Sequence, residues 1–254
     1  MINLETFNKF DSKEYLREYY SNIGPENHGL LDSFAKTYRD ATENSLILEF
    51  GGGPTVYQLI TAARNARSIH FSDYLQTNLD EVSKWRRCSP EAFNWSTFVA
   101  EALALEGLDK VTYEDIESRM KMMRRKINKF FLCDAYQENP LGSKYRNHYN
   151  LISTNFVVDS ITTSRETWKQ LMKNVCSMLR KDGSLILTSL KEAEYYTIGD
   201  KKFPAVYLTE KDLEITLKNL GFQDLLIRSI PAERNNNNED YQGYNGLIFV
   251  KASR

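Results

Sequence analysis

The chain has 254 residues, and its 33 Lys and Arg against 34 Asp and Glu give a formal net charge of -1. This balance provides no overall attraction to phosphate backbones or anionic lipid, so we expect neither nucleic acid nor a membrane as the main partner. With 41% hydrophobic and 12% aromatic residues, the composition excludes a disordered or fibrous chain and fits one large globular domain.

The segment MINLETFNKFDSKEYLREYY lacks the apolar core of a signal peptide, and no later run approaches the roughly 18 apolar residues of a membrane span. We therefore expect a cytoplasmic protein. Its cysteines, Cys88, Cys133 and Cys176, are odd in number and form no CxxC pair. This pattern favours reduced thiols in or near the core over disulfides or a zinc site.

Two helices are predicted before the first strand, and strand-like and helix-like segments follow one another after it. The predicted helices are residues 12–20, 27–38, 54–64, 76–88, 96–106, 113–126, 165–180 and 210–220. The predicted strands are residues 45–50, 68–73, 129–134, 149–156, 183–190, 222–230 and 245–253. This order is typical of an α/β fold.

We expect the first five strands to be parallel. The last two should pair antiparallel because residues 231–244 between them are polar and too few for a packed crossover helix. The layout predicts a single Rossmann-like domain over residues 1–254, with a seven-stranded, mostly parallel sheet, an antiparallel C-terminal strand and helices on both faces. Five mostly parallel strands followed by an antiparallel pair is the arrangement of class I S-adenosylmethionine-dependent methyltransferases, an analogy of fold alone.

The first predicted strand runs directly into three glycines, Gly51, Gly52 and Gly53, which are followed by Pro54 and Thr55. Glycines between a strand and a helix permit a tight turn and let a ligand approach the backbone without Cβ interference. We therefore expect a nucleotide-like ligand over this turn, against the alternative of an ordinary connection. The spacing satisfies neither the GxGxxG dinucleotide fingerprint nor the GK[ST] of a Walker A loop.

Two carboxylates end the second and third predicted strands. Asp73 stands 22 residues after Gly51, close to the spacing at which an acidic residue meets the two hydroxyls of a ribose. Asp134 closes the third strand, where its side chain can receive an adenine amino group. The alternative for each is simple capping of the chain that follows. Together with the glycines, they indicate an adenosine site.

Several successive blocks of the chain carry a family resemblance. EFGGGPTVYQLI, SDYLQTNLDEVSKW with PEAFNW, FLCDAYQENPLG, LISTNFVVDSI and YYTIGDKKF resemble blocks of the nicotinamide, phenylethanolamine and indolethylamine N-methyltransferase family. The similarity begins at Phe7-Asn8, includes EYLREYY at residues 14–20 and runs to residues 245–247. It covers residues 106–126 and the asparagine run at 235–238 poorly.

The resemblance implies an S-adenosylmethionine-dependent methyltransferase of the EC 2.1.1 class that yields S-adenosylhomocysteine. Residues 1–42 would form a helical lid over a core at residues 43–254. The residues that it places at the cofactor are Tyr15, Tyr20, Gly51, Gly52, Gly53, Thr55, Tyr57, Asp73, Tyr74, Asn78, Asp134, Ala135 and Thr154. The tyrosine hydroxyls and Thr55 would hold the amino-acid end, and Thr154 would lie near the sulfonium.

The substrate side departs from the nicotinamide methyltransferases of this family. Their Asp just after the fifth strand, which meets the carboxamide, is replaced within Thr188-Ser189-Leu190, and a serine is replaced at Pro204 or Ala205. We therefore do not expect nicotinamide as the natural substrate. The candidate substrate-binding residues by position are Tyr19, Asp159, Ser189, Tyr196 and Tyr244. The candidates for amine contact or proton acceptance are Asp159, Glu192 and Glu194, although the two glutamates would ordinarily be solvated surface charges.

The remaining motifs favour structural roles. The histidines, His28, His70 and His148, lack metal spacing, and we expect no metal. Residues 119–129 are basic, and they fit a helix with a solvated charged face and Met120, Met123 and Ile127 turned inward better than a site for an anionic substrate or RNA. The expected protein is thus a monomeric methyltransferase that acts on an amine-bearing small molecule. The alternatives are an O- or S-methyltransferase, a non-catalytic cofactor-binding protein, and a dinucleotide-dependent oxidoreductase.

Overall fold

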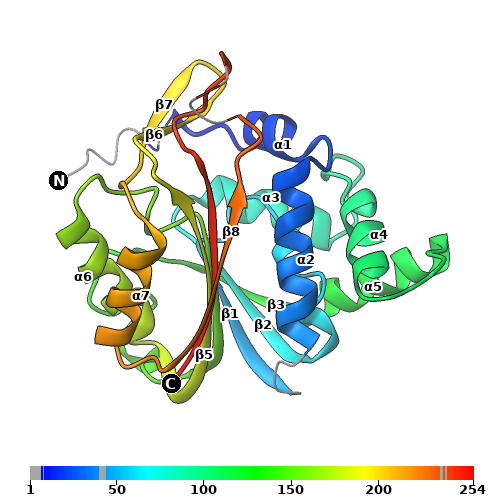
Figure 1. Ribbon diagram of the computed structural model, residues 1–254. Helices are drawn as coiled ribbons and strands as arrows, with labels where there is room; N and C mark the ends of the chain where they lie inside the picture. The colour runs from blue at the N-terminus through cyan, green and yellow to red at the C-terminus, as the bar shows by residue number, and fades with distance from the viewer. Residues whose placement is uncertain (1–6, 8, 40–43, 235–236, 238) are drawn as a thin grey trace.

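The computed structural model describes residues 7, 9–39, 44–234, 237 and 239–254, so part of the predicted lid and of the asparagine run lies outside the described residues. The described chain forms a seven-stranded sheet in the order β3-β2-β1-β4-β5-β9-β8 (Figure 1). Its strands are β1 (Ser45–Phe50), β2 (Ala66–Asp73), β3 (Ile127–Leu132), β4 (Tyr149–Asn155), β5 (Leu179–Lys191), β8 (Asp224–Pro231) and β9 (Gly246–Ser253).

The expected strand directions are confirmed. The pairs β1 with β2, β2 with β3, β1 with β4 and β4 with β5 are all parallel. Strand β9 lies antiparallel between β5 and β8. All six residues of β1 are buried, as expected for a central strand covered on both faces. The strand order reverses between β1 and β4, and at such a point α/β sheets offer a crevice at the carboxyl ends of their strands.

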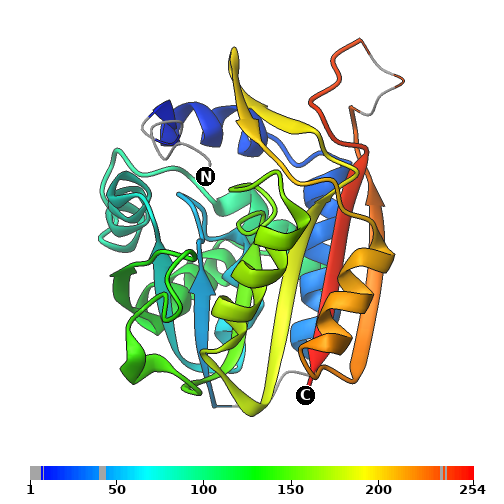
Figure 2. The ribbon, with the colours of Figure 1, turned by 90° about the vertical axis from the view of Figure 1, so that its left-hand side faces the viewer.

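Helices cover both faces of the sheet (Figures 1 and 2). They are α1 (Ser12–Tyr20), α2 (Pro25–Arg39), α3 (Gln76–Arg86), α4 (Ser96–Leu105), α5 (Tyr113–Lys126), α6 (Arg165–Cys176) and α7 (Glu210–Asn219). Helices α2 to α5 pack into one buried apolar cluster, and α6 and α7 pack into a second cluster on the opposite face. Helix α1 lies across one end of the sheet, beyond the carboxyl ends of the parallel strands (Figure 1).

The prediction of a helix at residues 54–64 is wrong. After the glycine turn the chain forms only two short 3₁₀ turns, η2 (Tyr57–Leu59) and η3 (Ala62–Arg64). Val56, with φ -132° and ψ -1°, lies outside the α-helical region, and β-branched and aromatic residues at this point have weak helix propensity. The segment is buried along nearly its whole length, so tertiary packing rather than helix formation determines its path.

A hairpin between residues 195 and 204 was not predicted. Strands β6 (Tyr195–Ile198) and β7 (Lys201–Pro204) pair antiparallel across Gly199 and Asp200. Gly199 has φ +58°, a conformation that glycine adopts readily. The hairpin lies beside α1, where the backbone N–H of Gly199 donates to Glu18 at 2.8 Å and the Tyr19 hydroxyl donates to the carbonyl of Thr197 at 2.6 Å.

The histidines and cysteines of the chain differ in how far they are exposed to solvent. His70 is buried, and its Nδ1 lies 3.0 Å from the Tyr149 hydroxyl, whereas the exposed His28 lies 2.7 Å from Glu101. Burial lowers the pKa of His70 to about 4, so it is neutral at physiological pH.

Cys133 and Cys176 are buried as expected. Cys88 is exposed, contrary to expectation, because it follows α3 in a left-handed turn with φ +56°.

Helix α5 buries one charged residue that was expected in solvent. Met120 and Met123 are buried as predicted, but so is Arg119. The Arg119 guanidinium donates to both carboxylate oxygens of Glu106 at 2.7 Å and to the carbonyl of Ile60 at 3.1 Å. This pairing connects α5 to the end of α4 and to the segment that follows the glycine turn.

We expect Arg119→Ala to lower the free energy of unfolding by roughly 3–5 kcal/mol, because it leaves the buried Glu106 carboxylate without its main partner. Arg64→Ala is the matched control, since Arg64 also approaches Glu106, at 3.4 Å, but is half exposed. Its loss should cost less than about 1 kcal/mol. Urea denaturation measures both variants, and equal losses would contradict the assignment.

Candidate cofactor and substrate site

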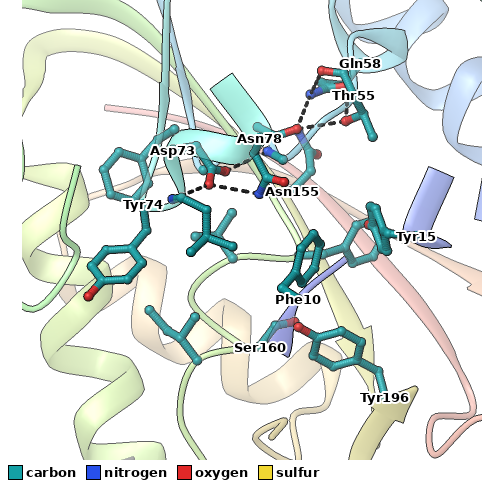
Figure 3. Close-up of a pocket in the computed structure, with 18 of the residues that line it drawn as sticks. Phe10, Tyr15, Thr55, Gln58, Asp73, Tyr74, Asn78, Asn155, Ser160 and Tyr196 are labelled. Atoms are coloured by element: carbon teal, nitrogen blue, oxygen red, sulfur yellow. Dashed lines mark hydrogen bonds between the residues drawn. The ribbon is translucent and has the colours of Figure 1, made fainter. Parts of the chain in front are cut away.

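One large cavity opens at the carboxyl ends of the parallel strands, beneath α1 and the β6–β7 hairpin. Residues that follow β1, β2, β3 and β4 form its base, and side chains from α1, α2 and the hairpin form its opposite wall. Figure 3 shows Asp73 and Asn78 on one side of this space and Phe10, Tyr15 and Tyr196 on the other. The cavity therefore joins the predicted cofactor residues to the predicted substrate side.

The glycine turn is shaped for close approach of a ligand to the backbone. Gly51 and Gly53 have φ +68° and +62°, which side-chain-bearing residues rarely adopt. A Cβ at Gly51 would lie 2.5 Å from Val157, and one at Gly52 would lie 2.3 Å from the ring of Phe71. A Cβ at Gly53 would meet no described atom within 4 Å, and Gly53 lines the cavity. The backbone of the glycine turn thus faces the cavity, and no side chain at Gly53 keeps a ligand away from it.

Asp73 at the end of β2 organises the base of the cavity. Its Oδ2 accepts the backbone N–H of Gly53 at 2.8 Å, and its Oδ1 accepts the N–H of Leu75 at 2.8 Å and the side-chain amide of Asn78 at 3.0 Å. Burial raises its pKa, and these donors act in the opposite direction. The backbone N–H of Tyr74 also acts to lower this pKa, so donors from the chain hold both carboxylate oxygens.

The predicted adenine side is largely apolar. Cys133, Ala135 and Tyr136 line it, with Tyr74 partly exposed at its edge. The Asp134 carboxylate accepts the backbone N–H of Tyr136 and the side-chain amide of Gln137, both at 2.9 Å. Each Asp134 oxygen therefore has one hydrogen-bond donor from the described chain and one further lone-pair direction that can accept a hydrogen bond.

A polar network supports the cavity beside the glycine turn. Gln58 and Asn155 donate to Oε1 of the buried Glu49 at 3.1 and 3.3 Å. Thr55 donates to Gln58 at 3.1 Å (Figure 3), and Thr188 donates to Asn155 at 2.7 Å. Burial raises the pKa of Glu49 to about 8, so this carboxyl is mostly protonated at neutral pH. The network fixes the orientation of polar groups that face the cavity.

Aromatic rings from the N-terminal helix cover the site. Tyr15 packs against Phe10 and Tyr19 with ring centroids 5.3 and 5.1 Å apart, and its hydroxyl lies 3.2 Å from that of Tyr20. Tyr20 packs in turn on Tyr57, at 5.1 Å. Burial raises the pKa of Tyr15 to about 12, so its phenol is a neutral hydrogen-bond donor at neutral pH.

Of the predicted cofactor residues, Thr154 alone is not among the residues that line the cavity. It is fully buried in β4, and its neighbour Asn155 lines the cavity because successive side chains of a strand point to opposite faces. The role predicted for Thr154 stays a prediction. The other twelve predicted cofactor residues all contribute to the wall.

The predicted substrate residues divide into two groups. Tyr19, Tyr196 and Tyr244 line the cavity. Asp159 and Ser189 are fully buried outside its lining, and Asp159 Oδ2 accepts the backbone N–H of Leu190 at 2.8 Å. This bond ties the segment after β4 to the end of β5. Burial raises the pKa of Asp159 to about 6.

The two glutamates predicted near the substrate lie away from the lining. Glu192 accepts the side-chain amide of Asn245 at 3.2 Å, and Glu194 is exposed to solvent. Proton acceptance by Asp159, Glu192 or Glu194 stays a prediction. The structure adds cavity-lining residues that the sequence did not single out, among them Phe7, Phe10, Glu26, Asn27, Gln58 and Asn155.

A family model, the NNMT/PNMT/TEMT family, matches residues 1–254, which is the full length of the chain. The chain belongs to this family. Its members are S-adenosylmethionine-dependent methyltransferases, and the family therefore supplies both the enzyme class and the cofactor. The resemblance found in the sequence blocks is confirmed.

Similar sequences extend over almost the whole chain. Indolethylamine N-methyltransferase of Mus musculus is 28% identical over 253 residues, covering 97% of this chain and 93% of that protein. Nicotinamide N-methyltransferase of Homo sapiens is 28% identical over 252 residues, covering 96% and 94%. Phenylethanolamine N-methyltransferase of Homo sapiens is 25% identical over 252 residues, covering 93% and 87%.

Solved structures share the fold at low sequence identity. Magnesium protoporphyrin IX methyltransferase from Synechocystis PCC 6803, solved with S-adenosylmethionine, has a TM-score of 0.58 at 14% identity and covers 98% of this chain and 94% of that chain. The 1,6-didemethyltoxoflavin-N1-methyltransferase of Burkholderia thailandensis, solved with its substrate and S-adenosylhomocysteine, has a TM-score of 0.56 at 11% identity, covering 98% and 87%. The predicted fold class is thereby confirmed.

The family cofactor fits the residues present. Cβ atoms at Gly51 and Gly52 would collide with their surroundings, Gly53 faces open space, and the Asp73 carboxylate lines the cavity, where a ribose hydroxyl can donate to it. Within the described ranges, no three His, Cys, Asp or Glu side chains gather as a metal site would require. None of the helices that the structure describes has the length and apolar character of a membrane span.

Asp73→Asn should remove most of the thermal stabilisation that S-adenosylmethionine gives, because asparagine cannot accept from both Gly53 and the α3 segment while offering an oxygen to ribose. At 100 times Kd the cofactor should stabilise the wild type by about 2.7 kcal/mol, or roughly 5–10 °C in melting temperature. Differential scanning fluorimetry gives each protein's shift relative to its own unliganded state.

Asp80→Asn is the matched control for Asp73→Asn. Asp80 lies on the exposed side of α3, where it accepts a hydrogen bond from Gln76 at 2.9 Å. This variant should keep the full cofactor-induced shift. If Asp73→Asn keeps it as well, Asp73 is not part of the cofactor site.

Proposed function

We propose that this protein transfers the methyl group of S-adenosylmethionine to an amine nitrogen of a small molecule. The observation that carries the proposal is one continuous cavity with two chemically different ends. One end holds the glycine turn and Asp73, and the other is an aromatic chamber that includes the rings of Phe10, Tyr15 and Tyr196. The three relatives compared above are all named as N-methyltransferases, which supports nitrogen as the acceptor atom.

The cofactor end would bind through residues that the fold already holds in place. We assign the ribose to Asp73, the adenine to the wall formed by Tyr74, Asp134 and Ala135, and the amino-acid end to Thr55 and the phenols of α1. The phenols are neutral donors, and such donors suit a carboxylate. The bound cofactor supplies a methyl group that its positive sulfur already activates for displacement.

The chain's main contribution to the reaction is positioning. The rings of Phe10, Tyr15 and Tyr196 exclude water and hold an acceptor against the open side of the glycine turn. Aromatic faces and hydroxyl dipoles also stabilise a cation in such a chamber. An amine enters mainly as its ammonium form and must lose a proton before its lone pair can attack, so the rate should rise with pH until the amine is neutral.

We further propose that the protein acts as a cytoplasmic monomer on small molecules, with neither nucleic acid nor a membrane as a partner. The near-zero net charge supports the absence of those partners. The monomer is supported by the origin of the walls, since α1, α2, the β6–β7 hairpin and the strand ends all come from one chain. The lid would thus comprise α1 and this hairpin together.

The test is methyl transfer from S-adenosylmethionine carrying a labelled methyl group. The wild type should label at least one member of a panel of primary and secondary amines, and mass spectrometry should place the label on nitrogen. Asp73→Asn should lose at least tenfold in kcat/KM at subsaturating cofactor, while Asp80→Asn should not.

Two results would contradict this proposal. Label found only on alcohols or thiols would identify an O- or S-methyltransferase. Cofactor binding without transfer to any amine, alcohol or thiol in the panel would identify a non-catalytic binding protein.

A further inference from the structure

Glu26 is a cavity-lining carboxylate for which no role has yet been assigned. It lies in the first turn of α2 and lines the same cavity as the glycine turn. Its Oε1 accepts the backbone N–H of Glu233 at 2.9 Å, and its Oε2 accepts the hydroxyl of Tyr244 at 3.1 Å. Two donors from the chain segment that leads into β9 therefore hold the carboxylate in one orientation.

Three acidic side chains line the cavity within the described residues, and they lie at different ends. Asp73 is the last residue of β2 and Asp134 follows β3, and both lie at the cofactor end. Glu26 lies among phenols from the other elements: burial is the main cause that raises the pKa of Tyr19, Tyr57 and Tyr244, and the Glu26 charge adds to it. It is therefore the carboxylate of the aromatic chamber.

The Glu26 carboxylate can accept further hydrogen bonds from a ligand. Each oxygen has one hydrogen-bond partner among the described residues, whereas a carboxylate offers about four lone-pair directions. Burial raises its pKa, the hydrogen bonds from Glu233 and Tyr244 act in the opposite direction, and the charges of Glu233 and Arg234 have smaller, opposed effects. A half-buried carboxylate beside aromatic rings favours a cation, because the carboxylate provides charge and the rings provide their negative faces.

We propose that Glu26 binds the ammonium group of the methyl acceptor and so selects amines over uncharged molecules of the same shape. This inference rests on the proposed function and names the residue through which the site would recognise its substrate class. Tyr244 orients the carboxylate through its hydroxyl, and Tyr19 and Leu247 complete the wall beside it.

A purely structural role for Glu26 is the alternative to ammonium binding. An acidic residue in the first turn of a helix is stabilised by the helix dipole, and the contact with Glu233 holds the neighbouring loop. Glu26→Gln keeps an oxygen that can accept from Glu233 and a polar group beside Tyr244, but it removes the charge. It therefore separates loop attachment from ammonium binding.

The experiment measures binding to the protein saturated with S-adenosylhomocysteine, by isothermal titration calorimetry at pH 7. The probes are 2-phenylethylamine, tryptamine and benzylamine, each matched with the alcohol of the same skeleton. Asp32→Asn is the control variant, because Asp32 lies on the same helix but pairs with Lys36 and Arg228 outside the cavity lining.

In the wild type, at least one amine should bind ten times more tightly than its alcohol. Glu26→Gln should weaken that amine roughly 10- to 100-fold, the range expected for a lost hydrogen bond to a charged group. The alcohol and S-adenosylhomocysteine should bind within twofold of their wild-type affinities. Asp32→Asn should behave as the wild type with every probe.

The proposal is overturned if no amine binds more tightly than its alcohol, or if Glu26→Gln keeps the full preference. It is also overturned if the variant weakens amine, alcohol and S-adenosylhomocysteine alike, which would show a structural role. Methyl transfer assayed on the same proteins separates the two hypotheses. Transfer to amines with an unchanged preference in Glu26→Gln overturns this inference alone, whereas charge-selective binding without any transfer to nitrogen overturns the proposed function.

Discussion

The side chain of Asp73 is the constraint on which the rest of the site depends. It joins the glycine turn after β1 to the start of α3, through Gly53 and Leu75. Asn78 extends the connection, because its amide donates to Asp73 while its oxygen accepts the hydroxyl of Ser12 at 2.7 Å. A buried series of hydrogen bonds therefore connects the carboxyl end of the sheet to α1, the helix that covers the cavity.

This connection has a consequence for cofactor binding. A ribose hydroxyl that donates to Asp73 must share the carboxylate with its internal donors or replace one of them. Replacement of the Asn78 amide would alter the contact with Ser12, and so the attachment of α1.

Much of this architecture was predictable from local sequence patterns. The bounds of α1, α5 and β1 agree with those predicted, because their caps, periodicity and flanking residues all favour the same element. Asp11 caps α1 by accepting the backbone N–H of Lys13 and Glu14, and Thr112 and Asp115 form a capping box on α5. The glycine turn and Asp73 were found because strand-end geometry brings them together.

The failures have tertiary causes. The helix predicted at residues 54–64 does not form, because its β-branched and aromatic residues have weak helix propensity and the segment is buried against the sheet and α5. The β6–β7 hairpin contains no strong apolar alternation, and its contacts with Glu18 and Tyr19 come from residues about 180 positions away. Glu26 resembles an ordinary acidic residue at a helix start, and only the folded chain shows that it faces the cavity.

The most direct test of the account is a crystal structure of the protein with S-adenosylhomocysteine. The account predicts adenosine over residues 51–53, with Asp73 accepting at least one ribose hydroxyl and α1 covering the ligand. A ligand bound elsewhere, or an Asp73 carboxylate that makes no contact with the ribose, would contradict it.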